Sequence, residues 1–412
     1  MILSVAIVDM ATDLYSVALP SIANYFKVEG SVVQLTISLN LVGFAVSGLI
    51  YGPLSDHYGR RPMMLIGMTI FTLASIMCYI ADSIALLILI RFIQGAGAGV
   101  AGVVGYAAIR DMYSGSEYSR VISKLNMVVA LSPGIAPVVG GYIISHGYSW
   151  KFLFFIISLA AIAMLIFIYF KLQETLIVNK NETSITNITT NIFKQYISIF
   201  RNYRFLGFSA IHGLTFMWLW AYVANYPFIF ESMGIEVQYF GYLISIIVIF
   251  YIIGTLINRR YVPKVGVSKM LIIGLVLPII SDSLLVYFYF ADKLNILILQ
   301  VAWIPANIGL ALVISNNVTS ALETIKGIGL GSAVLSFCNM MFGAIGIYIV
   351  GKFFRYGILP NLLLTIICST IAILMYSLLK YTEKHGHYLR DPGALLHSTD
   401  RHVNHSEFTQ LI

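Results

Sequence analysis

Charged residues are scarce in this chain. Only 10% of its 412 residues are Asp, Glu, Lys or Arg, whereas 59% are hydrophobic. Soluble domains carry about 25% charged residues, so the composition excludes a water-soluble globular protein. The apolar residues stand in runs of about 20, the length of a helix that crosses a bilayer. The sequence lacks the alternating segments of about ten residues that are typical of an outer-membrane barrel.

Several signatures of other protein classes are also missing. The three cysteines, Cys78, Cys338 and Cys368, lie inside apolar runs, which indicates packing rather than disulfides. No GxxxxGK[ST] loop is present, so we expect no use of ATP. No HExxH or DxD occurs, which disfavours a membrane-embedded enzyme such as a lipid-modifying transferase. We therefore expect no catalytic residue, no metal site and no cofactor.

The apolar runs predict an all-α integral membrane protein with twelve transmembrane helices. They lie at about 2–22, 33–54, 62–81, 84–108, 122–145, 150–172, 205–230, 238–257, 268–290, 295–317, 328–350 and 356–380.

One long polar connection divides six runs from six. We predict an N-terminal six-helix bundle at 1–172, a cytoplasmic linker at 173–204, a C-terminal six-helix bundle at 205–380 and a polar cytoplasmic tail at 381–412. Most histidines lie in the tail without regular ligand spacing, so we interpret it as disordered rather than as a metal site.

The formal charge of +7 reflects topology rather than a nucleic-acid partner. Lys and Arg cluster in alternate loops, as cytoplasmic loops do. These clusters include Arg60 with Arg61, Arg110 with Arg120 and Lys124, the linker residues, and Arg259 with Arg260. We therefore predict a multi-pass monomer in the bilayer of a bacterial inner membrane, with both termini cytoplasmic. The abundance of Ile, Asn, Lys, Tyr and Phe is typical of an AT-rich bacterial genome.

Charged residues inside the runs are costly, so each one needs a pathway or a partner. Asp9 and Asp13 are four apart and share one face of the first helix. Helix rise places Asp13 and Arg91 at a similar depth, each roughly 20 Å from the cytoplasmic surface. We interpret Asp13 as a group for proton coupling or substrate binding, with Asp9 as a second candidate. A purely structural Asp13–Arg91 pair is the alternative. Asp282 lies toward the outer end, where solvent could reach it.

Amide and aromatic residues inside the runs fit two interpretations. They could line a polar central pocket that accepts an amphipathic substrate. They could equally form helix–helix hydrogen bonds of about 0.6 kcal/mol or an aromatic belt at the membrane interface. The candidate pocket residues are Asn40, Gln94, Trp218, Tyr222 and Asn225.

The loop between the second and third runs reads GPLSDHYGRRPMM. Its central glycine permits a tight turn. Its aspartate can accept hydrogen bonds from an arginine or from a helix N-terminus. The candidate latch residues of this loop are Gly52, Asp56, Gly59, Arg60 and Arg61. A similar segment, GTLINRRYVPKVG, stands at 254–266 in the second half, which indicates a degenerate internal repeat.

This loop resembles the signature loop of the major facilitator superfamily. RFIQGAGAGV from Arg91 resembles the helix 4 motif, in which the arginine is linked to proton handling. SPGIAPVVGG resembles the helix 5 motif of the drug/proton antiporter branch, in which Pro and Gly allow bending and close packing. Its residues here are Pro133, Pro137, Gly140 and Gly141.

Within that branch the chain resembles the bicyclomycin-resistance (Bcr/CflA) efflux family. The segments that carry the resemblance are ATDLYSVALPSI at 11–22, IRDMYSGSEYSRVIS at 109–123, YVANYPFIF at 222–230 and SNNVTSALETIKGIGLGSAV at 315–334. The first of them places the family's acidic residue at Asp13.

The resemblance implies a major facilitator fold and a secondary active transporter. It would export small drugs by alternating access, drawing on the proton gradient without a cofactor, and its partners would be the small-molecule substrate and protons. A proton-coupled metabolite or siderophore exporter, or a symporter, on the same fold remains open. A non-transporting membrane sensor is the more remote alternative.

Overall fold

The computed structural model describes residues 2–176, 199–325 and 328–390, and these residues are helical apart from their connections. The first half consists of α1 (Ile2–Ser16), α2 (Leu19–Phe26), α3 (Gly30–Tyr58), α4 (Arg60–Ile80), α5 (Ile84–Met112), α6 (Gly115–Ser145) and α7 (Lys151–Lys171). The second half consists of α9 (Tyr203–Ser232), α10 (Val237–Val265), α11 (Val267–Phe290), α12 (Ile296–Leu322), α13 (Ile328–Lys352), the short 3₁₀ helix η1 (Phe354–Tyr356) and α14 (Leu359–Arg390). Most of the predicted linker and tail lies outside the described residues.

The first predicted run is broken rather than continuous. α1 and α2 meet at 59°, and together they make one span. Pro20 lies in the first turn of α2, where it has no N–H to bond the preceding turn. The Ser16 hydroxyl donates to the Asp13 carbonyl at 2.8 Å, just before the break. Among the described residues, eleven further helices are long and apolar enough to cross a membrane.

Two connections between neighbouring helices consist of a single glycine. Gly59 joins α3 to α4 with φ +101°, and Gly266 joins α10 to α11 with φ +89°. Only glycine adopts such angles at little cost. The predicted turn at Gly59 is therefore present, and the second half repeats it at the corresponding connection.

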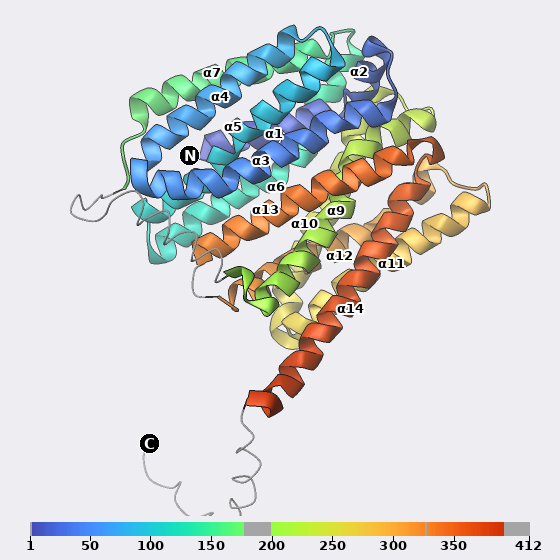
Figure 1. Ribbon diagram of the computed structural model, residues 1–412. Coiled ribbons are helices and arrows are strands. Elements are labelled where there is room, and N and C mark those ends of the chain that lie inside the picture. Colours follow the sequence, from blue (N-terminus) through green and yellow to red (C-terminus); the bar gives the residue numbers. More distant parts are fainter. Residues whose placement is uncertain (1, 177–198, 326–327, 391–412) are drawn as a thin grey trace, which may run out of the picture.

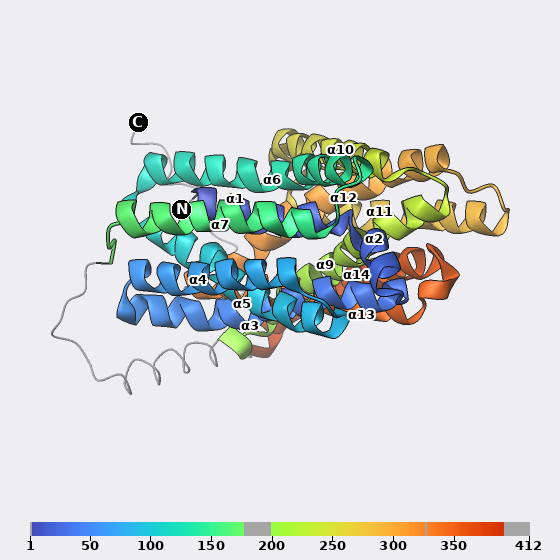
Figure 2. The same ribbon diagram turned by 90° about the horizontal axis from the view of Figure 1, so that it is seen from above.

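The helices gather into two groups, α1–α7 and α9–α14, and Figure 1 shows them side by side. Two seams join the groups, one between α6 and α10 and the other between α3 and α13. Viewed from above, these seams lie on opposite faces of the molecule (Figure 2). The fold is therefore two six-helix bundles, as the sequence predicts, when α1 and α2 are counted as one span.

Polar contacts cross both seams. The Ser245 hydroxyl of α10 donates to the Gly134 carbonyl of α6 at 2.5 Å, and the Ser38 hydroxyl of α3 donates to the Ala344 carbonyl of α13 at 2.9 Å. Gly30, at the start of α3, lies against the ring of Phe354. These contacts lie in the middle of the bundles and at one of their two ends, the end at which α2 and η1 lie.

Candidate functional site

Asp9 and Asp13 lie on the face of α1 that points away from the buried core of the first half. Both are partly exposed, and the two carboxylates lie within electrostatic reach of each other. The Ser132 hydroxyl of α6 donates to Asp13 Oδ2 at 2.7 Å. No ion pair among the described residues involves either aspartate. The site thus presents two carboxylates without a protein cation.

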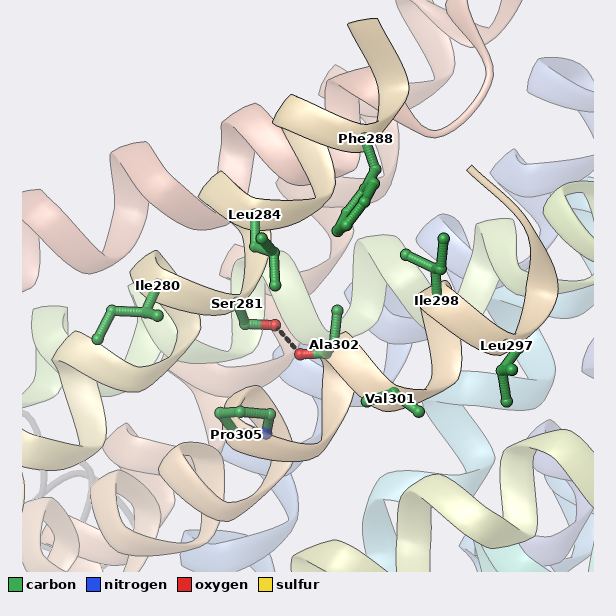
Figure 3. A pocket seen from close by; sticks show the side chains of 9 residues that line it. All are labelled: Ile280, Ser281, Leu284, Phe288, Leu297, Ile298, Val301, Ala302 and Pro305. Atoms are coloured by element: carbon green, nitrogen blue, oxygen red, sulfur yellow. Dashed lines mark hydrogen bonds between the residues drawn. The ribbon is translucent and has the colours of Figure 1, made fainter. Parts of the chain in front are cut away.

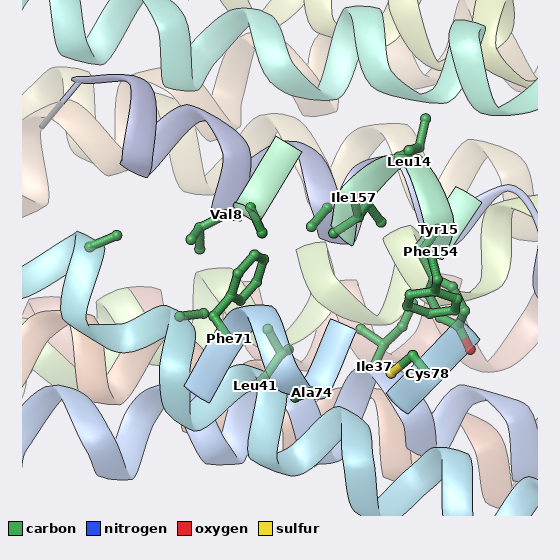
Figure 4. Close-up of a cluster of buried hydrophobic side chains, with 14 of the residues drawn as sticks. Val8, Leu14, Tyr15, Ile37, Leu41, Phe71, Ala74, Cys78, Phe154 and Ile157 are labelled. Carbon is green, nitrogen blue, oxygen red and sulfur yellow. The ribbon is translucent and has the colours of Figure 1, made fainter. Parts of the chain in front are cut away.

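Arg91 lies deep inside the first half and is only 1% exposed. Its guanidinium carbon stands 4.5 Å from the ring centroid of Tyr15 and 5.8 Å from that of Phe154. Figure 4 shows these two rings beside Cys78 at one end of the buried cluster. Arg91 Nη1 donates to Gln94 Oε1, while Nε and Nη2 have no partner in the part of the chain that the structure describes. Cation–π contact with two rings therefore offsets much of the cost of burying this charge.

The structure does not pair Asp13 with Arg91. Residues two apart on a helix point to nearly opposite sides, and it is Tyr15, not Asp13, that faces Arg91. Asp13 turns instead toward Ser132 of α6. Helix rise predicts the depth of Asp13 in the bilayer but not how α1 is rotated about its axis. The observed rotation turns Asp13 away from Arg91.

Two of the predicted pocket residues hold the first half together. The Asn40 side chain of α3 donates to the Arg91 carbonyl of α5 at 2.8 Å. Gln94 donates to the Ser75 hydroxyl of α4 at 2.7 Å. A side chain at Gly95 would clash with the Asn40 carbonyl, so α3 and α5 pack backbone to backbone here. Asn40 and Gln94 thus make helix–helix hydrogen bonds in this conformation, and their pocket role stays a prediction.

The aromatic candidates of α9 lie in the core of the second half. Trp218 is 5% exposed and Tyr222 is 2% exposed. They are one turn apart on α9 and contact each other, and Tyr222 packs on Trp303 of α12. The Tyr222 hydroxyl donates to Asp282 Oδ2 at 2.9 Å. Asp282 is 0% exposed, so the expectation that solvent reaches it is wrong.

Asn225 occupies a third environment, at the contact between the halves. Its Oδ1 accepts from Gln34 Nε2 of α3 at 3.0 Å, and its Nδ2 donates to Asn361 of α14 at 2.5 Å. Gln34 Nε2 also donates to the Ala224 carbonyl at 3.3 Å. The five predicted pocket residues thus fall into three separate places: the contacts of α3, α4 and α5, the core of the second half, and the contact between the halves.

The predicted latch forms ion pairs within the first half. Arg60 Nη1 lies 2.6 Å from Asp56 Oδ1, and Arg60 Nε lies 2.8 Å from Asp111 Oδ2 at the end of α5. The Arg61 Nη2 group donates to the Tyr169 carbonyl of α7 at 2.9 Å. Gly52 lies against α5. In this conformation none of the described ion pairs of Arg60 or Arg61 reaches the second half.

Glu174 completes this loop, although it is not among the residues predicted from the sequence. One carboxylate oxygen accepts from the Arg60 N–H at 2.9 Å and the other from the Arg61 N–H at 3.2 Å. The carboxylate therefore occupies the N-terminus of α4, the role considered for Asp56. An acid just after a predicted helix carries no periodic signal, so only the folded connection brings it to Arg60.

The proline and glycine motif lies in the C-terminal half of α6, which passes through Pro133 and Pro137 without ending. A Cβ at Gly140 would lie 2.6 Å from the Leu14 carbonyl of α1, and one at Gly141 would lie 2.8 Å from the Val237 carbonyl of α10. Neighbouring glycines thus allow α6 to approach one helix of each half.

Comparison with known sequences settles the family. The family described as Major Facilitator Superfamily matches residues 1–347. The chain belongs to this superfamily. A bicyclomycin resistance protein homolog of Haemophilus influenzae is 27% identical over 388 residues, which cover 91% of this chain and 94% of that protein. Multidrug resistance protein D of Escherichia coli is 35% identical over 164 residues, 39% of this chain and 41% of its own length.

Solved structures show the same architecture. A bacterial homolog of the human lysosomal transporter Spinster, in an inward-facing and unoccupied conformation, superposes with a TM-score of 0.72. The two chains are 15% identical, and the match covers 92% of this chain and 95% of the other. The protein is thus a multi-pass membrane transporter with the major facilitator fold, which is not an enzyme fold.

A cavity of about 470 Å³ in this major facilitator chain lies between α11 and α12 (Figure 3). Its lining is almost entirely apolar, and four of its residues are well exposed on the outer surface: Ile280, Leu284, Leu297 and Val301. It contains none of the candidate site residues. Within the described ranges no group of His, Cys, Asp or Glu side chains has the arrangement of a metal site.

Proposed function

We propose that this transporter exports small amphipathic or cationic drugs in exchange for protons, with Asp13 as the coupling carboxylate. The observation that carries the proposal is the Asp9–Asp13 pair, which is partly exposed, close to α6 and without a protein cation. A carboxylate in such a place must bind a proton, a cationic substrate or water to offset its desolvation. The drug-resistance relatives support export as the direction.

Competition for Asp13 supplies the coupling. Protonation neutralises the carboxylate and removes its attraction for a cationic substrate, whereas a bound substrate excludes the proton. Ser132 holds Asp13 Oδ2 at 2.7 Å and so fixes the direction of the carboxylate. Asp9 lies one turn away on α1, and its negative charge attracts cations to the site.

Arg91 acts through Tyr15 rather than by direct pairing. Its charge is stacked on the Tyr15 ring, and Tyr15 belongs to the same turn of α1 as Asp13. The Tyr15 hydroxyl shares a hydrogen bond with Thr36 at 2.7 Å, which ties α1 to α3. In the proposal, Arg91 fixes the rotation of α1 and thereby the position of the coupling carboxylate.

Alternating access uses the two seams and the loop. The halves rock about the α6–α10 and α3–α13 contacts, and Pro133, Pro137, Gly140 and Gly141 allow α6 to follow. The loop around Asp56, Arg60 and Arg61 holds the cytoplasmic ends of the first half in one arrangement. We further propose the bacterial inner membrane as the location, both termini in the cytoplasm, a monomer as the working unit, and the proton gradient as the energy source without a cofactor.

The test is substrate-driven proton movement in proteoliposomes under an imposed pH gradient, with a panel of cationic and neutral drugs. Wild type is expected to move protons when a substrate is added. The proton flux of Asp13→Asn is expected to be at least tenfold lower than that of wild type. Asp82→Asn is the control, because Asp82 is 90% exposed and lies 3.4 Å from Lys151 on the surface. Its flux is expected to match that of wild type.

Three outcomes contradict the proposal in different ways. Proton flux that survives in Asp13→Asn excludes Asp13 as the coupling group. Absence of flux with every drug in wild type excludes drug/proton exchange and favours a narrow metabolite carrier or a sensor. Uptake of a metabolite together with protons would indicate a symporter.

A further inference from the structure

Asp282 is the most deeply buried acid of the second half. It is 0% exposed, near the middle of α11. Tyr222 of α9 donates to its Oδ2 at 2.9 Å, and the Thr365 side chain of α14 also hydrogen-bonds to it. The Ser281 hydroxyl lies 3.4 Å from Asp282 Oδ1 but donates to the Ala302 carbonyl. None of the described ion pairs includes Asp282. An ionised carboxylate in this place would be a buried charge without a counterion, which is very costly.

The surroundings of Asp282 contain no cation from any packed helix. Its titratable neighbours are the phenols of Tyr222 and Tyr226, both on α9. α12 contributes the indole of Trp303, which contacts Tyr222, and α14 contributes a hydroxyl; neither group titrates. The charged residues of α10 stand exposed at its far end, at Arg259, Arg260 and Lys264.

The first half has a buried cation, Arg91, at a position where the second half has an uncharged residue. In each half a tyrosine of the first helix packs on a residue about two turns into the fourth: Tyr15 meets Arg91 of α5, and Tyr222 meets Trp303 of α12. The third helix supplies the next member of each cluster.

That third-helix residue is Cys78 in the first half, within electrostatic reach of Arg91, and Asp282 in the second. The sixth helix completes each cluster, with Phe154 of α7 against Tyr15 and with Thr365 of α14 against Asp282. In the second half, Trp303 therefore stands at the position that corresponds to Arg91, and the acid Asp282 lies beside this cluster.

We propose that Asp282, held by Tyr222 and Thr365, is a second proton-binding site and carries a proton in this conformation. Because a protonated carboxyl group carries no charge, it can be buried without a counterion and still accept and donate hydrogen bonds. Release of the proton requires that water reach the Tyr222–Asp282 contact. The site is distinct from Asp13, which lies in the other half and is partly exposed.

Infrared spectroscopy of the purified full-length chain in lipid nanodiscs tests the proposal, because a protonated carboxyl group absorbs apart from a carboxylate. Near neutral pH we expect Asp282→Asn to lose the absorption of one buried carboxylic acid relative to wild type. Asp292→Asn is the matched control, since Asp292 is exposed at the end of the same hairpin and asparagine tolerates its φ of +54°. Its spectrum is expected to equal that of wild type in this region.

Tyr222→Phe provides a second measurement that keeps the carboxyl group in place. Loss of the hydrogen bond at 2.9 Å is expected to move the carboxylic band to higher frequency. Identical carboxylic regions in wild type and Asp282→Asn overturn the proposal, because Asp282 is then ionised. If Asp282→Asn does not fold, an unshifted band in Tyr222→Phe overturns it instead. The experiment needs neither substrate nor gradient, so its failure is separate from failure of drug/proton exchange at Asp13.

Discussion

At the scale of single residues, Glu174 resolves an electrostatic conflict at the start of α4. This helix begins with Arg60 and Arg61, two cations at the end where the helix dipole is already positive. Burial opposes the charge of Glu174, but four backbone N–H groups donate to its carboxylate and lower its pKa. Glu174 follows α7 and lies outside the membrane spans, so the carboxylate fixes the linker's first residues against the loop.

We expect Glu174→Ala to lower the stability of the folded protein at pH 7 by about 0.5 kcal/mol, a capping effect reduced by solvent exposure. Because the pKa of Glu174 is lower in the folded protein, its contribution is complete above the ordinary glutamate pKa of 4.5. The contribution is lost as the pH falls from that value through the folded pKa. Thermal unfolding in detergent between pH 7 and pH 4 measures the difference.

The same series with Glu323→Ala gives the control, since Glu323 is an exposed acid at the end of α12. Its difference from wild type should stay small across the range. A stability gap for Glu174→Ala that widens on acidification would contradict the capping role.

At the scale of elements, α6 is the helix on which both halves converge. Its glycines differ in what surrounds them. Gly141 lies against the backbone of α10, whereas a Cβ at Gly134, on the same seam, would lie 3.6 Å from Val248, an ordinary contact. Backbone atoms cannot move aside as a side chain can, so the two positions should respond oppositely to an added methyl group.

Gly141→Ala is therefore expected to destabilise the seam by about 1–3 kcal/mol, the typical cost of overpacking. Gly134→Ala should be neutral or stabilising by up to about 1 kcal/mol, because alanine is the better helix former. Thermal stability and drug transport of both variants provide the comparison. Equal losses in the two variants would show that the close approach at Gly141 does not limit packing.

The sequence predicted the elements well and their rotations poorly, for identifiable reasons. Run length determines where helices lie, and the positive φ of Gly59 follows from its place between two runs. The break after Ser16 depends on one proline inside an apolar run, which hydropathy does not register. Whether Asp13 or Tyr15 faces Arg91 depends on packing between α1, α5 and α7, and no periodicity in so uniformly apolar a chain reports it.

At the scale of the whole molecule, the polar contacts between halves are few and specific. Gln34 of α3 donates to Asn225 and to the Ala224 carbonyl of α9, and Ser38 donates to the Ala344 carbonyl of α13. All of them would have to break if the halves separate at the end that carries α2 and η1. Inside a bilayer such bonds have few competitors from water, so they bias which end of the transporter is closed.

The double variant Gln34→Leu with Ser38→Ala removes these donors from α3 alone. With a net contribution of about 1 kcal/mol for each of two side chains, the ratio of closed to open forms at this end should fall roughly twenty- to thirtyfold. The hydrogen bonds of Gln34 and Ser38 go to the second half, whereas Asn40 provides the hydrogen bond from α3 to α5. The variant should therefore fold and differ from wild type in its conformational equilibrium.

Spin labels at Tyr25 of α2 and Tyr356 of η1, in a background without the native cysteines, report this equilibrium as a distance distribution. Both positions are exposed, on opposite halves of the same end. The double variant should populate longer distances than wild type, whereas Ser377→Ala, which removes an exposed hydroxyl bonded within α14, should not. Unchanged distributions in the double variant would mean that the apolar contacts of the seams, such as Gly30 on Phe354, hold this end closed without the amides. The polar contacts would then serve only to set the register of α3 on the second half.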